Sequence, residues 1–160
     1  MALKKSLLTG LGFGLTSAVI TTLGLMIGLN ASTGSKIVVI GGILTIALAD
    51  SFSDALGVHV SKETEPGAIA KDVWEATAFT FIFKIIFTLS FAIPVIFLPL
   101  SIAIIVNIIW GLGILSLLSF KLVKSDGQSR WESLGEHLGV AVTVLLATNY
   151  LGNIISKYFQ

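Results

Sequence analysis

Five long apolar stretches alternate with short polar segments along the 160 residues of the chain. A helix needs about 20 apolar residues to cross the hydrocarbon core of a bilayer, and each stretch reaches that length. The helices predicted in this way span about residues 7–29, 37–60, 73–98, 100–123 and 134–155. The pattern therefore predicts an all-α membrane protein with a single transmembrane domain over residues 1–160.

The polar segments predict how the helices are joined. Three joints are the sequences "NASTGSK", "SKETEPGAIAKD" and "KSDGQSRWES". Only "PVIFLP" separates the third and fourth helices, which predicts a tight helical hairpin with proline at its turn. The N-terminal "MALKK" leads into a segment of spanning length without a small-residue cleavage site, so we expect a retained first helix.

Composition supports the membrane assignment and excludes other classes. Charged residues make up 12% of the chain, about half their share in a soluble domain, and hydrophobic residues make up 54%. A net charge of +1 argues against a nucleic-acid-binding protein, which needs a concentrated excess of Lys and Arg. Without cysteine, the chain has neither a thiolate metal ligand nor a disulfide. The partner that composition indicates is the lipid bilayer.

The distribution of Lys and Arg predicts the orientation of the helices. Short loops rich in these residues stay in the cytoplasm. One side collects Lys4, Lys5, Lys62, Lys71, Lys121, Lys124 and Arg130, and the other side has only Lys36 and Lys157. We therefore expect a cytoplasmic N-terminus and an external C-terminus, in the plasma membrane of a prokaryote.

Small residues form a seam along the first predicted helix. They are Gly10, Gly14, Ser17, Thr21, Gly24 and Gly28, at alternating steps of four and three residues. Such a seam lets another backbone approach closely, either within the chain or across a two-fold symmetric dimer. We expect a homodimer through this seam, and Ser17 and Thr21 would line a polar path if that path follows the dimer axis.

The second predicted helix carries two carboxylates within the membrane span. Asp50 and Asp54 share a sector of about 100° with Ser53, Gly57 and Ser61. A charge that faces lipid costs about 2.5–3.5 kcal/mol by insertion scales, so both Asp side chains should face protein or water. The structural alternative is that each Asp pairs with a cation or caps a broken helix. The functional alternative is a site for a transported ion.

Lys84 falls within the third predicted helix and supplies such a cation. Lys84, Asp50 and Ser17 each lie twelve residues from a charged residue at the cytoplasmic flank of their helices, or roughly 18 Å at 1.5 Å per residue. They can meet at one depth, and we predict that Lys84 approaches Asp50 as a counter-charge. The contact is either a permanent ion pair or one that an incoming metal ion or proton displaces.

Further polar residues lie toward the helix ends. Near the predicted cytoplasmic ends, the acidic side chains are Glu63, Glu65, Glu75 and Glu136. Singly they are ordinary solvated helix ends, but together they would form a vestibule that attracts cations. Asn107 and Asn149 fall at similar depths toward the outer side. We expect a structural hydrogen bond between them, linking the fourth and fifth helices.

Oxygen donors without thiolates suit hard or borderline divalent ions such as Mn²⁺, Fe²⁺, Mg²⁺ or Ca²⁺. We expect Asp50 and Asp54 to be the principal ligands of a transported ion, with oxygens from Ser17, Thr21 and Ser53. No permanently bound cofactor is expected. Two Asp on adjacent turns supply only part of a coordination shell, so the remaining ligands must come from another helix or a second subunit. Carboxylates that crowd together could also carry protons, which would permit metal–proton exchange.

Catalysis is the contrasting class, and the residues argue against an enzyme. An intramembrane aspartyl protease brings two Asp together from different helices and has a GxGD-type motif, which this chain lacks. An intramembrane serine protease needs Ser and His at its active site, but His59 and His137 both lie near the predicted cytoplasmic edge. The alternatives to metal transport are transport of another small solute, such as a zwitterion, and a membrane assembly protein that transports nothing.

Two segments resemble the vacuolar iron transporter (VIT) family. They are "TTLGLMIGL" at residues 21–29 and "LADSFSDALGVHVS" at residues 48–61, which follows the family's Leu-Ala, Gly and Val-Ser frame. The helix count, the cytoplasmic N-terminus and the "LP" of the hairpin also agree, so the resemblance covers nearly the whole chain. It implies a homodimeric antiporter that exports Fe²⁺ or Mn²⁺ from the cytoplasm in exchange for protons, through a path at the subunit interface.

The chain departs from the family's pattern at the positions that would bind the metal. Ser17 stands where the family has Asp, Asp54 where it has Met, and Val58 where a Glu follows the Gly, whereas Asp50 replaces a small residue. The acidic ligands thus look as if they had moved from the first helix to the second. The family's cytoplasmic metal-binding helices between the second and third spans are missing, which implies a short member of the family.

Overall fold

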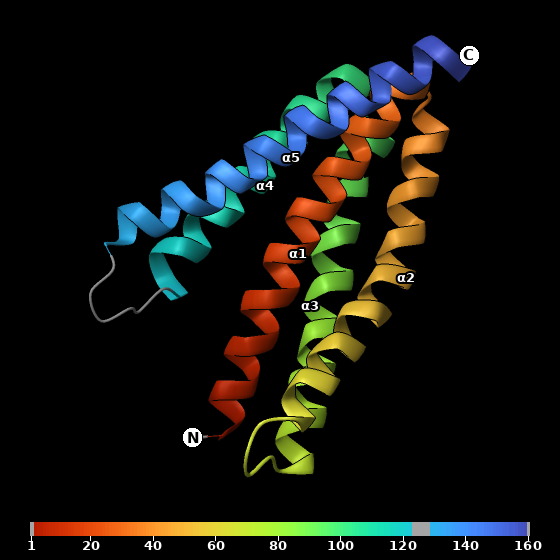
Figure 1. Ribbon diagram of the computed structural model, residues 1–160. Helices are drawn as coiled ribbons and strands as arrows, with labels where there is room; N and C mark the ends of the chain where they lie inside the picture. The colour runs from red at the N-terminus through yellow and green to blue at the C-terminus, as the bar shows by residue number, and fades with distance from the viewer. Residues whose placement is uncertain (1, 123–128, 160) are drawn as a thin grey trace.

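The computed structural model describes residues 2–122 and 129–159, and this part of the chain forms five α-helices (Figure 1). They are α1 (Ala2–Thr33), α2 (Lys36–Glu63), α3 (Ala70–Phe97), α4 (Leu100–Leu122) and α5 (Arg130–Phe159). Each is long and apolar enough to cross a membrane. The prediction of five helices of membrane-spanning length and hydrophobicity is confirmed, as expected of an integral membrane protein.

Polar residues extend most of the helices beyond the predicted apolar limits, and glycines close two of the turns. Gly34 has φ of +58°, and its N–H donates to the carbonyl of Asn30, which ends α1. Gly67 has φ of +75° in the short segment between α2 and α3. Positive φ values favour glycine because it has no Cβ.

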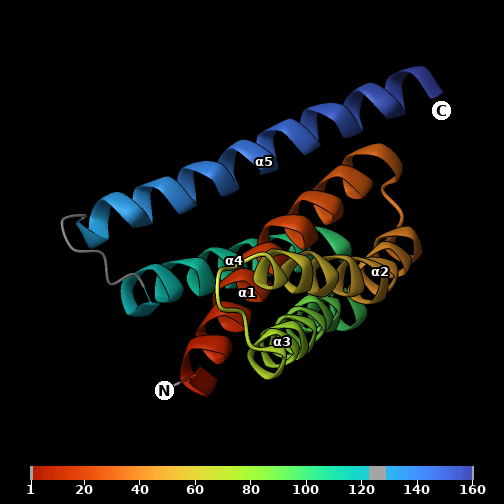
Figure 2. The same ribbon diagram turned by 60° about the horizontal axis from the view of Figure 1, so that its bottom comes forward.

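The central helix is α1, which packs against each of the other four. Its side chains Ala18, Val19, Leu23 and Met26 are fully buried among those helices. In the views of Figures 1 and 2, α2 and α3 lie beside α1, and α5 runs along one side of the molecule. A helix that is apolar on nearly all sides is expected at the centre of a bundle rather than at its edge.

The small-residue seam of α1 packs against other helices of the same chain. A Cβ on Gly14 would lie 2.8 Å from the carbonyl oxygen of Thr80 in α3. A Cβ on Gly24 would lie 2.9 Å from the side chain of Val144 in α5. The seam therefore faces α3 along its first half and α5 along its second half. Helices of the same chain already cover these parts of the seam, and a homodimer through it is not shown.

The turn between α3 and α4 differs in one respect from the predicted hairpin. Pro99 lies at the turn as expected, but Pro94 lies inside the last turns of α3. The N–H of Leu98 donates to the carbonyl of Pro94 at 2.9 Å, and the Lys36 ammonium donates to the carbonyls of Ile96 and Leu98. A cation at a helix C-terminus satisfies exposed carbonyls, so Lys36 fastens the start of α2 to the end of α3.

Beyond this turn, α4 slants away from α3 and packs against α1 and α5 as well (Figure 1). Asn107 of α4 is fully buried and donates to the Met26 sulfur at 3.2 Å and to the carbonyl of Phe91 at 2.9 Å. The side chain of Asn149 is exposed on α5. The predicted Asn107–Asn149 hydrogen bond is therefore wrong, because Asn107 points toward α1 and α3.

Candidate charged site between α1, α2 and α3

The ammonium group of Lys84 lies at a junction of three helices. The Lys84 side chain is only 1% exposed, and its Nζ lies 2.5 Å from Oδ2 of Asp50. The same Nζ also contacts Oδ2 of Asp54 and donates a hydrogen bond to Oγ of Ser17 at 2.7 Å. A lysine ammonium has three N–H donors, and here three oxygens from α1 and α2 surround it. We refer to these four residues as the charged site.

The structure confirms the predicted approach of Lys84 to Asp50 and adds Asp54 as a second partner. Both carboxylates come from adjacent turns of α2, so one ammonium reaches both of them. Sequence reasoning assigned only Asp50 to Lys84 and did not predict the contact with Asp54. The long alkyl chain of lysine explains the difference, because it can reach oxygens one turn away from its own depth.

Close packing between α1 and α3 positions the lysine. A Cβ on Gly14 would lie 3.3 Å from the backbone nitrogen of Lys84, so glycine at this position lets the two backbones approach. Lys84 can therefore send its side chain past α1 toward α2. Apolar neighbours bury its methylene groups while the ammonium stays among oxygens, as is common for long cationic side chains.

The two acidic side chains of the charged site are much more exposed than its lysine. The side chains of Asp50 and Asp54 are 30% and 18% exposed, compared with 1% for Lys84. Next to them, Ala49, Ser53, Gly57 and Ser61 are exposed. We call these four residues the α2 polar face. The charged site is thus closed on the side of α3 and accessible along the α2 polar face.

The remaining predicted ligand oxygens lie near the charged site but are not part of it. The Thr21 hydroxyl donates to the backbone carbonyl of Ser17 at 2.8 Å, so its proton is already in use. Ser53 lies one turn from Asp50 on the exposed side of α2. Its position would suit a ligand that arrives from outside this single chain better than one held inside it.

The glutamates of the predicted vestibule lie in different parts of the chain, and three of the four have a basic side chain nearby. Lys62 pairs with Glu65 at 2.6 Å, His59 lies 3.7 Å from Glu63, and Lys71 lies 3.9 Å from Glu75. Glu136 is exposed on α5, which packs against α1 and α4. The structure therefore places three of the four glutamates at the ends of α2 and α3, and it places the fourth on a separate helix.

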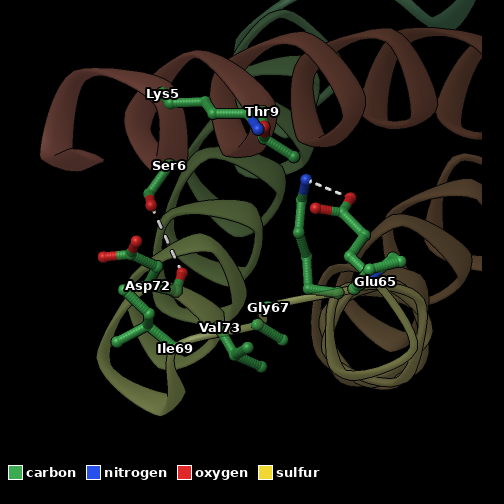
Figure 3. A pocket seen from close by; sticks show the side chains of 11 residues that line it. Lys5, Ser6, Thr9, Glu65, Gly67, Ile69, Asp72 and Val73 are labelled. Atoms are coloured by element: carbon green, nitrogen blue, oxygen red, sulfur yellow. Dashed lines mark hydrogen bonds and ion pairs between the residues drawn. The ribbon is translucent and has the colours of Figure 1, made fainter. Parts of the chain in front are cut away.

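A small polar pocket lies where the N-terminal part of α1 meets the α2–α3 connection (Figure 3). On one side the Lys62 ammonium reaches the Glu65 carboxylate, and on the other the Ser6 hydroxyl donates to the carbonyl of Asp72 at 3.2 Å. The hydrogen bond from Lys62 lowers the pKa of Glu65, and the charge of Lys5 acts in the same direction. The Lys62 contact thus ties the connection to the end of α2, and the Ser6 contact ties α1 to the start of α3.

Metal coordination by one chain is limited. Among residues 2–122 and 129–159, no three His, Cys, Asp or Glu side chains gather where they could hold one ion. The charged site supplies two carboxylates, and Lys84 contacts both of them. One chain therefore offers at most part of a divalent ion's coordination shell, in agreement with the expectation that further ligands must come from elsewhere.

Sequence reasoning missed two hydroxyls that share the buried face of α3 with Lys84. Thr80 and Thr88 lie four residues before and after Lys84, and both are fully buried. Side chains four residues apart lie on the same face of a helix. That spacing on both sides of an intramembrane lysine is the signal that could have found them.

The helices and the charged site define a class: a five-helix membrane protein with a buried lysine held by two carboxylates of a neighbouring helix. No protein-family model, curated protein or solved structure matches this chain. Its function must therefore be inferred from the charged site itself.

Proposed function

We propose that this protein transports a small cation across the membrane, and that Lys84 occupies the carboxylate site until the cation arrives. One observation carries the proposal: the lysine is buried while its two carboxylates remain partly exposed along the α2 polar face. Desolvating both partners of an ion pair is costly, and here only Lys84 is fully desolvated. Here the anionic partners stay accessible, as an entry site for a cation requires.

Charge balance favours exchange with protons. With both carboxylates ionised and Lys84 protonated, the charged site has a net charge of −1. A divalent cation would change this to +1, an unfavourable charge inside a membrane. If Lys84 releases a proton as the metal binds, the net charge of the site becomes zero. Metal moving in one direction and a proton in the other would then be linked at the same three side chains.

The cargo that suits this site is Fe²⁺ or Mn²⁺. Carboxylate and hydroxyl oxygens are suitable ligands for such ions, and the chain has no cysteine that would favour Cu(I). The resemblance to the vacuolar iron transporter family points to the same ions and to export from the cytoplasm. With seven cations on one side and two on the other, we place the N-terminus in the cytoplasm of a prokaryotic cell.

A second copy of the chain would complete the coordination shell by docking on the α2 polar face. Within the described part of the chain, nothing lies within 4 Å of a Cβ placed on Gly57, so this face is open. Its small residues permit close contact between two helices. A two-fold axis here would bring Asp50 and Asp54 of both copies together, giving four carboxylates. The dimer we propose therefore uses α2 rather than the covered seam of α1.

Flux through purified protein tests the proposal. Wild type in proteoliposomes should take up Mn²⁺ and Fe²⁺ and move protons the other way, as followed with an internal pH dye. The double variant Asp50→Asn, Asp54→Asn should lose metal flux. Asp72→Asn, which removes a carboxylate in the first turn of α3, is the matched control and should keep metal flux. Absence of flux in folded, dimeric wild type would refute metal transport and leave the other solute or the assembly role.

Disulfide cross-linking tests the dimer separately, because the chain has no native cysteine. Ser53→Cys on the α2 polar face should form a covalent dimer under mild oxidation in membranes. Ile86→Cys is the control, since Ile86 is 55% exposed but lies on α3. Equal cross-linking of the two variants would indicate random collision and would remove the α2 dimer.

A further inference from the structure

Three buried hydroxyls lack a hydrogen bond that many other helical hydroxyls make. Many serines and threonines in these helices donate to a backbone carbonyl three or four residues earlier, as Thr21 and Thr80 do at 2.8 Å. Thr22, Ser51 and Thr88 are fully buried, yet within residues 2–122 and 129–159 their hydroxyls have no hydrogen-bond partner. Their oxygens point into the bundle without the usual backbone bond.

Asn107 adds a fourth unpartnered oxygen to this part of the core. Its amide nitrogen is used by Met26 and Phe91, but Oδ1 has no partner among the described residues. A buried polar atom without a partner costs free energy comparable to a lost hydrogen bond. In the bilayer, no surrounding solvent offsets that cost.

These oxygens lie in a series that starts at the charged site. On α1, Thr22 lies between Ser17, which contacts Lys84, and Met26, which contacts Asn107. On α3, Thr88 lies between Lys84 and Phe91, whose carbonyl also contacts Asn107. Along its own helix, each threonine thus lies between a residue of the charged site and a residue that contacts Asn107.

The series has a lower and an upper end. Ser51 follows Asp50 directly on α2 and lies at the level of the charged site. Asn107 is seven residues from the first residue of α4, or about 10 Å from that end of the helix. By the orientation proposed above, that end lies on the outer side of the membrane. We call Ser51, Thr22, Thr88 and Asn107 the polar column.

We propose that the polar column binds a file of water molecules that continues the charged site toward the outer side and conducts its protons. Buried waters make about three hydrogen bonds each to polar groups that otherwise lack partners, and the polar column offers such groups at successive levels. Its hydroxyls can both donate and accept, which proton transfer along a chain requires. The conducting role rests on the proposed function, whereas the presence of water does not.

Silver ion is the probe for water in the polar column, because it is about the size of a water molecule and reacts with thiolates. Thr22→Cys and Thr88→Cys are made singly in the cysteine-free chain, treated with Ag⁺ in membranes, unfolded and labelled with maleimide. Protection from labelling measures the Ag⁺ reaction. Ala18→Cys on α1 and Ala92→Cys on α3 are buried apolar controls. We expect the column variants to react at least tenfold faster than the control on the same helix.

Rates equal to those of Ala18→Cys and Ala92→Cys would overturn the proposal and make the polar column dry. Asn107→Cys repeats the measurement on a third helix in case one threonine variant does not fold. This readout needs no transported metal, so failure of the proposed function leaves it intact. If wild type transports Mn²⁺, the Thr88→Val variant should move protons at least tenfold more slowly than wild type. Mn²⁺ binding at Asp50 and Asp54 should be retained. Unchanged proton movement would exclude the conducting role.

Discussion

The small residues of α1 and those of α2 look alike in the sequence but differ in their surroundings. On α1, Gly14 and Gly24 lie against α3 and α5, and an added Cβ would meet atoms of both helices. On α2, Ser53 and Gly57 are exposed beside two carboxylates. A small-residue pattern thus shows how closely a second helix can approach, but it does not show whether that helix belongs to the same chain.

Charge is the feature that separates the two patterns. The α1 seam has hydroxyls and glycines only, so covering it costs little desolvation. The α2 polar face borders Asp50 and Asp54, and burying it would also desolvate carboxylates. Lys84 lies where the two regions meet, because its backbone packs on Gly14 and its ammonium reaches both Asp side chains.

Removing the Lys84 ammonium should have the largest effect on stability. Lys84→Met keeps the buried volume but leaves two carboxylates without their cation, so we expect unfolding free energy to fall by about 3–5 kcal/mol. Dodecyl sulfate titration followed by circular dichroism measures it. Adding Asp50→Asn and Asp54→Asn should recover part of the loss. Strictly additive losses would contradict the ion pairs, and Lys71→Met, on an 81% exposed side chain, should be neutral.

Two serines compare the covered and open regions directly. Ser17→Ala removes an acceptor 2.7 Å from the Lys84 ammonium, and hydrogen bonds to charged groups contribute about 1.5–3 kcal/mol. Ser53→Ala, on the α2 polar face, should change monomer stability by less than about 0.5 kcal/mol. The same titration, run at protein concentrations that keep the chain monomeric, checks both. If Ser53→Ala lowered the unfolding free energy as much as Ser17→Ala, the covered and open regions would not differ in their contribution to stability.

Two glycines test the packing difference at somewhat smaller expected cost. Gly14→Ala brings a methyl group to 2.8 Å from a backbone oxygen, and such overpacking costs about 1–3 kcal/mol. Gly57→Ala has nothing within 4 Å among the described residues, so the better helix propensity of alanine should stabilise α2 by up to about 1 kcal/mol. Opposite shifts in the unfolding midpoint are the expected result. Destabilisation by both changes would mean that Gly57 is already in close contact.

The five apolar stretches of the sequence predict the number of helices, and bilayer thickness sets the minimum length of each. The sequence also predicted the contact between Lys84 and Asp50 from depth alone. Depth does not determine the direction of a side chain around its helix, which is why Asn107 was assigned to Asn149 instead of Met26 and Phe91. Thr22 and Thr88 escaped notice for another reason. A helical hydroxyl usually bonds to its own backbone, and only the packed structure reveals which hydroxyls do not.

The smallest effect concerns the connection between α2 and α3, outside both compared regions. The lowered pKa of Glu65 means that its ionised form is favoured in the folded protein. The resulting stabilisation is fully present above its ordinary pKa of about 4.5 and is lost as the pH falls through the lowered value. Proteolysis of the connection should therefore accelerate at acidic pH in wild type but not in Glu65→Gln. Identical pH profiles would show that the pair with Lys62 does not hold the connection.

The order of residues in the charged site has a consequence for how the chain enters the membrane during synthesis. Asp50 and Asp54 leave the ribosome about thirty residues before Lys84, so α2 reaches the translocon with two uncompensated carboxylates. Each then costs about 2.5–3.5 kcal/mol in the bilayer until its cation arrives. The short connection between α2 and α3 lets the two helices insert as a pair. Pairing with Lys84 would remove that cost, so we expect α2 to insert stably only once α3 has been synthesised.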